Sequence, residues 1–297
     1  MSKQRAFTLS EVTIVIILIG IIAVILIPFM VRTFQKEKWI NTYKRTYAET
    51  YQALTLMALE EDCSKSLYCT GAFRGTLEKS TEKFGELFSS KMKVRTNCGL
   101  TKTGGICFSH KVRTLFKSTD KKQNVAETIK DSMTNNPTGG ANIIWGDLDF
   151  PYTFVTARGV SYALFSFGTE CLKSSESGKN ESYLDFYVIR AKDTKNADFL
   201  EVADKIPEND NDNPMLNLCG FIIVDVNAEA EPNVWGKDVF GLWITDTKTL
   251  GVYPFGSASD KLFYQKCKSP GSPTNEYDGR GCAARIIEDN WAMKYLE

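Results

Sequence analysis

Residues 7–31 read Phe7-Thr-Leu-Ser-Glu11 followed by VTIVIILIGIIAVILIPFMV, near the start of a chain of 297 residues. The last part of this stretch, residues 12–31, carries no charged side chain. At a helical rise of about 1.5 Å per residue it extends over about 30 Å, the thickness of the hydrocarbon core of a bilayer. The stretch therefore predicts a membrane-spanning helix.

An acidic residue stands where this apolar run begins. Glu11 directly precedes the run, and Lys3 and Arg5 lie a few residues earlier. A carboxylate facing lipid costs roughly 2.5–3.5 kcal/mol even on a lenient insertion scale, so an acid here indicates a function and a partner charge. A cut between Ala6 and Phe7 would create that partner, an α-ammonium group four residues before Glu11.

The stretch Lys3-Gln-Arg-Ala-Phe-Thr-Leu-Ser-Glu11 with its apolar run resembles the class III leader of type IV pilins and type II secretion pseudopilins. The resemblance implies that prepilin peptidase cleaves between Ala6 and Phe7, that the new Phe7 amine is N-methylated, and that Glu11 guides assembly into a filament. Two positions depart from the usual pattern, because Ala6 stands where Gly is usual and Ser10 where an apolar residue is common.

The resemblance also implies partners and a location. The expected partners are copies of this chain or other pilins, prepilin peptidase, and an assembly platform in the bacterial inner membrane. The amino end is expected in the cytoplasm and the head outside, although Arg32, Lys36 and Lys38 after the span outnumber Lys3 and Arg5 before it, against the positive-inside rule. The alternatives are a plain anchor and a signal peptide, whose apolar region would be only about 7–15 residues long.

Length and charge bound the other function classes. We expect a leader over residues 1–6, the transmembrane half of a long helix over 7–31, its amphipathic half over 32–62, and a globular disulfide-rich head over 63–297. The 36 basic and 36 acidic residues balance, so no nucleic acid partner is expected, although a local basic patch stays open.

The cysteines favour disulfides in a head outside the cytoplasm. The chain has 8 cysteines, no Cys-x2-Cys pair and a single histidine, His110, which argues against a zinc site. Sequence does not fix connectivity, and reduced thiols are the alternative. Proximity along the chain suggests three pairs, Cys63 with Cys69, Cys98 with Cys107, and Cys267 with Cys282, which leaves Cys171 with Cys219.

The helix is expected to continue into the head, from about residue 7 to residue 60. Its second half has an apolar stripe at steps of three and four, which predicts packing under a domain. The stripe consists of Ile40, Tyr43, Tyr47, Leu54 and Ala58, joined by Tyr51. Gly20 and Pro28 are the weak points, and we expect a kink or local melting between them, as in assembled filaments of the resembled family.

The head is predicted to be α+β, with the long N-terminal helix packed on an antiparallel sheet, which is the pilin-like arrangement. An amphipathic helix is expected over residues 77–92 and a short terminal helix over 283–293. Polar stretches at 118–140 and 192–214 predict surface loops. Strands rich in β-branched and aromatic residues are expected at 152–156, 160–167, 183–189, 220–225, 240–245 and 251–255.

One loop of the head has the residue types of a calcium site. Asp225, Asn227, Asn233 and Asp238 place oxygen-bearing side chains after a strand, and calcium takes about six to eight oxygen ligands. The loop is no EF-hand, and the alternative is an Asx-turn loop whose side chains bond their own backbone. Related pseudopilins hold calcium in a C-terminal loop. The protein is not expected to require a cofactor. If this loop binds a metal ion, the expected ion is calcium.

No enzyme is expected, because His110 has no accompanying nucleophile elbow, phosphate-binding glycine loop or H-E-x-x-H motif. The tryptophans suit a glycan- or protein-binding surface or, as is more usual, the core. The predicted function is a pilin or pseudopilin assembled into a type IV pilus or type II secretion pseudopilus. The alternative is a membrane-tethered binding protein that does not polymerise; a membrane-anchored hydrolase has no motif behind it.

Overall fold

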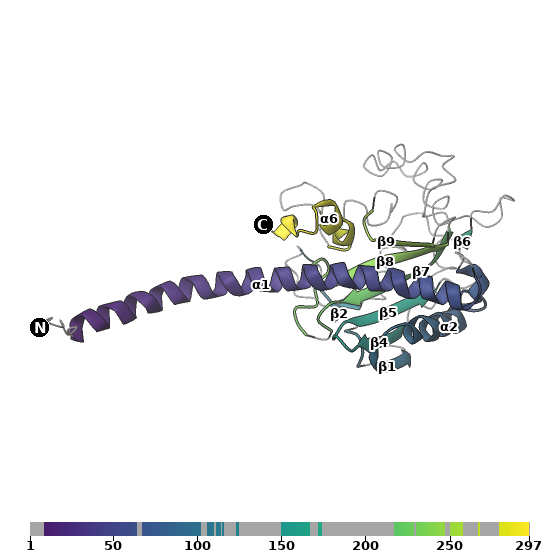
Figure 1. The fold of residues 1–297 in the computed structure, drawn as a ribbon, viewed down its shortest axis with the longest axis horizontal. Helices are drawn as coiled ribbons and strands as arrows, with labels where there is room; N and C mark the ends of the chain where they lie inside the picture. The colour runs from purple at the N-terminus through teal and green to yellow at the C-terminus, as the bar shows by residue number, and fades with distance from the viewer. Residues whose placement is uncertain are drawn as a thin grey trace, which may run out of the picture.

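The protein consists of one long helix, α1, whose first half projects from a head that contains the remaining elements (Figure 1). The structure is a computed structural model. It describes residues 9–63, 67–101, 106–109, 111–113, 115, 123–124, 150–166, 172–173, 217–228, 230–246, 250–257, 267 and 279–296. The long helix and the antiparallel sheet of the head confirm the predicted fold class.

Helix α1 runs from Leu9 to Glu60 without interruption, through Gly20 and Pro28. Its most apolar 18-residue window has a mean hydropathy of 3.4, with 0% of it buried, and it is long and apolar enough to cross a membrane. The local melting predicted between Gly20 and Pro28 is not present in this single chain. Pro28 still lacks the N–H that a helix interior would use, so the prediction for assembled filaments stands as a prediction.

The second half of α1 buries one face against the sheet, as predicted. The Tyr43 ring stacks on Phe240 with centroids 4.2 Å apart, and the Tyr47 hydroxyl donates to the Val252 carbonyl at 2.8 Å. The prediction was wrong for Tyr51, which is 47% exposed because it lies at the edge of the buried face. The buried residues are Ile40, Tyr43, Thr46, Thr50, Ala53, Leu54, Met57 and Ala58.

The main sheet is antiparallel throughout, in the order β1-β4-β5-β7-β8-β9, with β6 paired to β7. Two short strands, β2 and β3, form a separate pair. The strand bounds are β1 Val94–Leu100, β2 Lys111–Val112, β3 Gln123–Asn124, β4 Tyr152–Thr156, β5 Ser161–Ser166, β6 Leu172–Lys173, β7 Asn217–Asp225, β8 Val239–Asp246 and β9 Leu250–Pro254. Five of the predicted strands are therefore present.

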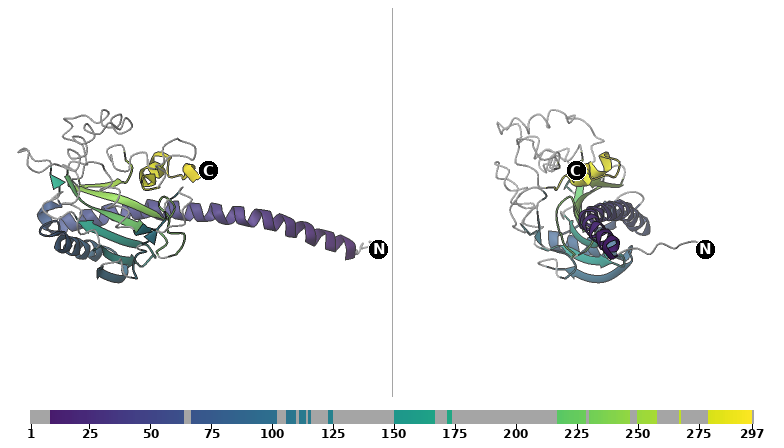
Figure 2. Two further views of the ribbon diagram at one scale, coloured as in Figure 1. Left: turned by 180° about the vertical axis from the view of Figure 1, so that it is seen from behind. Right: turned by 90° about the vertical axis from the view of Figure 1, so that its left-hand side faces the viewer.

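Side chains alternate between the two faces of the sheet. Tyr162 on β5 and Phe240 on β8 lie on the face that carries α1. Phe165 and Phe221 lie on the other face, with ring centroids 4.5 Å apart. Figure 2 shows the sheet curved around α1, so that the helix lies in a trough formed by its strands.

Helix α2, Leu77–Ser90, covers the end of the sheet formed by β1, β4 and β5. Thr76 caps its first turn by accepting from the backbone N–H of Lys79. Phe84 and Phe88 are spaced by four residues and are fully buried. Gly85 brings α2 close to β4, since a Cβ there would lie 2.0 Å from the Tyr152 ring. The helix ends two residues earlier than predicted.

Strand β1 was not predicted, although Val94, Cys98 and Leu100 recur with a period of two. Bulges after Val94 and Asn97 interrupt its pairing with β4. The alternation of half-buried and exposed residues is lost in the last three residues of the strand. An edge strand of this kind has a weak sequence signal.

The chain ends beside the part of α1 that enters the head (Figure 1). Helix α6, Cys282–Glu288, and the 3-10 helix η4, Lys294–Leu296, replace the single predicted helix. Asn290 and Trp291 separate them, with φ of 60° and 59°. These left-handed conformations end a helix. Helix α6 packs on β8 and β9, and the Tyr43 hydroxyl of α1 donates to its Ala283 carbonyl at 3.4 Å.

Three of the four predicted disulfides are present in the structure. Their Cα–Cα distances are 5.5 Å for Cys63 and Cys69, 6.1 Å for Cys98 and Cys107, and 4.8 Å for Cys267 and Cys282. Cys219 is also disulfide-bonded. Its predicted partner, Cys171, lies outside the described residues.

Other predictions also fall outside the described residues. They concern Ala6, Phe7, His110, Trp145, the strand at 183–189, and the loops at 118–140 and 192–214, apart from two residues of the first loop that form β3.

Candidate functional site

The N-terminal candidate site lies at the free end of α1. The helix begins at Leu9, and Glu11 is an exposed acid in its first turn. The first N–H groups of a helix lack intrahelical partners, and its dipole is positive there, so this turn favours a carboxylate. Ala6 and Phe7 lie just before the described residues.

Nothing in the described part of the chain covers the apolar half of α1. Its large side chains are roughly half to three-quarters exposed, such as Ile16 at 64%, Leu18 at 53% and Val24 at 74%. Because this surface amounts to many unburied aliphatic side chains, it must be covered by lipid or by other helices. Glu11 therefore lies at the start of a surface whose partner is outside the chain.

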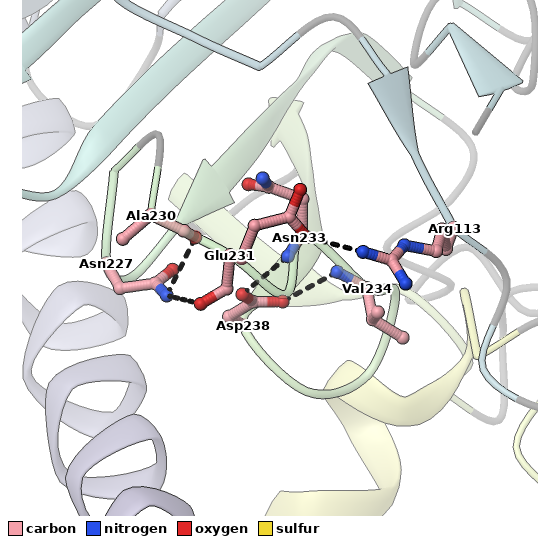
Figure 3. Close-up of polar contacts among 7 residues, drawn as sticks. All are labelled: Arg113, Asn227, Ala230, Glu231, Asn233, Val234 and Asp238. Carbon is pink, nitrogen blue, oxygen red and sulfur yellow. Dashed lines mark hydrogen bonds and ion pairs between the residues drawn. The ribbon is translucent and has the colours of Figure 1, made fainter.

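Three of the predicted calcium residues, Asn227, Asn233 and Asp238, lie in the loop between β7 and β8 (Figure 3), and the fourth, Asp225, is the last residue of β7. Both carboxylate oxygens of Asp238 accept backbone N–H groups, from Asn233 at 2.9 Å and from Val234 at 2.7 Å. Asp225 Oδ1 accepts the backbone N–H of Asn227 at 3.1 Å, which is an Asx turn. The side-chain amide of Asn227 donates to the loop carbonyls of Ala230, at 3.0 Å, and Glu231, at 3.3 Å.

An ion pair that sequence reasoning missed ties this loop to a distant segment. Arg113 Nη2 lies 2.5 Å from Glu231 Oε2, and its backbone N–H donates to the Asn233 carbonyl at 2.8 Å (Figure 3). The Trp235 N–H in turn donates to the Arg113 carbonyl at 3.0 Å. The two partners of the ion pair are 118 residues apart. No local pattern relates them, so only the fold reveals the contact.

Asp238 is fully buried. Burial raises the pKa of this carboxyl to about 6, and the hydrogen bonds from the Val234 and Asn233 N–H groups oppose the rise. The cause is desolvation, because a carboxylate removed from water loses hydration that only partners can replace.

The loop fits an Asx-braced turn, with a donor set that is only partly suited to calcium. The side-chain oxygens of Asn227 and Asn233 are buried without a hydrogen-bond partner in the described part of the chain, so they are the oxygens a cation would use. The oxygens of Asp238 already bind the backbone. No group of three or more His, Cys, Asp or Glu side chains suited to a metal occurs among the described residues.

The tryptophans among the described residues do not form the surface that a glycan or protein would need. Trp235 and Trp243 are fully buried, as the more usual role of aromatic residues predicts. Trp291 is half-buried, and Lys44 Nζ lies 5.3 Å from the centroid of its ring. These residues are part of the core and of its contact with α1.

Comparison with known proteins identifies the N-terminal segment. Residues 1–27 match the family model of the prokaryotic N-terminal methylation motif. This is the class III prepilin leader of type IV pilins and pseudopilins, and the long helix and antiparallel sheet form the corresponding α+β arrangement. Residues 1–27 thus have the motif that is typical of type IV pilin-like substrates of prepilin peptidase. The search of curated proteins and the search of solved structures each returned no match.

Proposed function

We propose that this protein is a structural subunit, a pilin or pseudopilin, of a type IV pilus or a type II secretion pseudopilus. Prepilin peptidase removes residues 1–6, the new Phe7 amine is methylated, and the mature chain is anchored in the inner membrane with its head outside. An assembly platform then packs it into a helical filament with copies of itself or with other pilins.

The observation that carries this proposal is the combination of an uncovered apolar helix with an acid at its start. The apolar half of α1 buries none of its span within the chain. Packing of such helices against one another would keep this surface covered once the subunit leaves the bilayer, where exposure to water would cost roughly 25 cal/mol per Å² of apolar area. Glu11 would then pair with the Phe7 amine of a neighbour, which sets the register between subunits.

Substitution of Glu11 tests this mechanism. We expect Glu11→Ala to abolish incorporation into filaments, because the carboxylate that sets the register is lost, while the head keeps its melting temperature. The measurement is the amount of the protein in sheared or overexpressed filaments, with the total membrane-bound protein as reference.

Glu37→Ala is the matched control, since Glu37 is also an exposed acid of α1 but lies beyond the span. It should incorporate normally. A Glu11→Ala variant that still assembles would contradict the proposal and favour a tethered protein that does not polymerise, because a tether needs only the apolar span.

A further inference from the structure

Three disulfides have both cysteines among the described residues, and in one of them a cysteine is exposed. In the pair Cys63–Cys69, Cys63 is buried and Cys69 is exposed. The cysteines of the other two pairs are buried or half-buried: Cys98, Cys107, Cys267 and Cys282. Thiol–disulfide exchange requires a thiolate to reach one of the two sulfur atoms. Of these three disulfides, Cys63–Cys69 is therefore the one that is open to attack from solution.

This disulfide lies at the C-terminal end of α1. The backbone N–H of Cys63 donates to the Ala58 carbonyl at 2.9 Å, and Asp62 has a left-handed φ of 54°, which together end the helix. Figure 1 shows this end of α1 on the side of the head that is remote from the apolar half. The disulfide is thus far from the surface that lipid or other helices would cover.

Contacts other than the disulfide hold the segment that contains Cys69. Leu67 is fully buried, and its backbone N–H donates to Oδ1 of Asp246, the last residue of β8, at 3.0 Å. The Thr70 hydroxyl donates to the Leu67 carbonyl at 2.6 Å, and Phe73 is fully buried. Cleavage of the disulfide should therefore leave this segment in place, so that exchange does not require the head to unfold.

A hydrogen-bond acceptor is already in place for the thiol that cleavage would release. Cys63 Sγ lies 3.3 Å from the carbonyl oxygen of Glu61. In the disulfide this sulfur carries no hydrogen, whereas a reduced Cys63 would donate its S–H to that carbonyl. A buried donor that has a partner avoids the cost of an unsatisfied polar group. The site of the leaving sulfur thus accommodates a neutral thiol.

We propose that Cys69 is a site of reversible modification by a low-molecular-weight thiol. The thiolate attacks Cys69 Sγ, and a new S–S bond forms as the bond to Cys63 breaks. The electron pair of the broken bond leaves on Cys63 Sγ, which takes a proton from water, so one disulfide replaces another without net oxidation. Because Cys63 stays close, its thiolate reverses the step by attacking Cys69 and expelling the bound thiol.

Exchange with glutathione in the folded chain tests the site. The full chain in mild detergent is incubated with reduced glutathione at about pH 8, where part of the thiol is ionised. The reaction is quenched early with N-ethylmaleimide, and the peptides are analysed by mass spectrometry. We expect glutathione on Cys69 and maleimide on Cys63. This should form at least about tenfold faster than modification of Cys98–Cys107 or Cys267–Cys282, because buried pairs must first open locally.

Tryptophan fluorescence recorded during the reaction should stay unchanged, since the head is expected to remain folded. Three results would overturn the inference: equal amounts of glutathione on Cys63 and Cys69, equal rates at the three pairs, or modification of Cys69 only after denaturant is added. None of these measurements involves a membrane or a filament. A negative result therefore leaves the Glu11 test and the proposed function unaffected.

Two single substitutions test access to each sulfur separately. Cys63→Ser leaves Cys69 as a free thiol, and Cys69→Ser leaves Cys63 as one, so each variant is the matched control for the other. In the folded chain, N-ethylmaleimide should alkylate the Cys69 thiol at least about tenfold faster than the Cys63 thiol, because Cys69 is exposed and Cys63 is buried. Equal rates, or a faster reaction of Cys63, would contradict the assignment of the attack to Cys69.

Discussion

The two halves of α1 form one continuous helix with opposite surroundings. From Leu9 to about residue 34 every large apolar side chain is exposed, whereas the second half places eight residues against the head. The first half is apolar on all sides and has no face that distinguishes a partner. The second half has a buried side fixed by rings and hydrogen bonds, such as Tyr43 on Phe240.

This difference separates two sources of stability. The head is held together by contacts within the chain, and its stability should be independent of the span. The first half gains its stability only from lipid or from other subunits, which is why a single carboxylate, Glu11, carries the specificity that side-chain packing gives in the head. Each test below asks whether this separation holds, beginning with the largest expected effect.

Leucine truncation in each half gives the most direct contrast. Leu54 is fully buried, so Leu54→Ala should lower the free energy of unfolding of the head by about 2–5 kcal/mol. The same change at Leu18, which is 53% exposed, should leave the unfolding of the head unchanged. Denaturant unfolding of the detergent-solubilised chain, followed by tryptophan fluorescence, measures both. An equal loss in the two variants would show that the halves are coupled.

The disulfide Cys267–Cys282, which joins the first residue of α6 to Cys267, should stabilise the head independently of the span. Replacing both cysteines with serine should lower the free energy of unfolding by about 3 kcal/mol, because the closed loop of 15 residues restricts the unfolded chain. The pair Cys63–Cys69, with a separation of 6, should give a smaller loss of about 2 kcal/mol. The reverse order in a thermal melt would contradict this loop-length explanation.

Asp238 should make the stability of the head depend on pH, with no contribution from the span. Burial raises its pKa to about 6, above the value of 3.8 for a free carboxyl, so the folded state binds the proton more readily. This contribution is fully present below about pH 4 and is lost as the pH rises to about 6, by at most about 3 kcal/mol. Unfolding of wild type and Asp238→Asn between pH 4 and 7 measures it.

The difference in stability between these two proteins isolates Asp238 from the other acids. It should change across pH 4–6 and be constant above. A difference that is constant throughout would show that the carboxyl is not perturbed. The same melts with excess calcium or chelator should be unchanged, because backbone N–H groups already bind Asp238. A calcium-dependent rise in melting temperature that is lost in Asn227→Ala/Asn233→Ala would contradict this expectation and place calcium at these two side chains.

The sequence was most informative where a physical requirement is local. A membrane span needs only consecutive apolar residues, and a half-buried helix needs only a period of 3.6, so both halves of α1 could be predicted. The strands with unbroken β-branched and aromatic runs, β4, β5, β7, β8 and β9, were predicted for the same reason. Disulfides between near neighbours in the chain also followed from spacing.

The sequence was least informative where contacts are distant. The pairing of Arg113 with Glu231 and the edge strand β1 depend on partners far along the chain. The residue types of Asp225, Asn227, Asn233 and Asp238 indicated that the loop would be rich in oxygen ligands. They could not indicate whether those oxygens bind backbone or metal, because that depends on the loop conformation, with Ala228 and Asn233 at φ of 56° and 49°.

The mature N-terminus tests the central claim most directly. Mass spectrometry of the protein purified from the membranes of cells that contain prepilin peptidase should find a chain that begins with N-methyl-Phe7 and lacks residues 1–6. That result would show that the apolar half of α1 starts with the amine to which Glu11 is expected to bind. An intact Met1, or cleavage at any other position, would contradict the account.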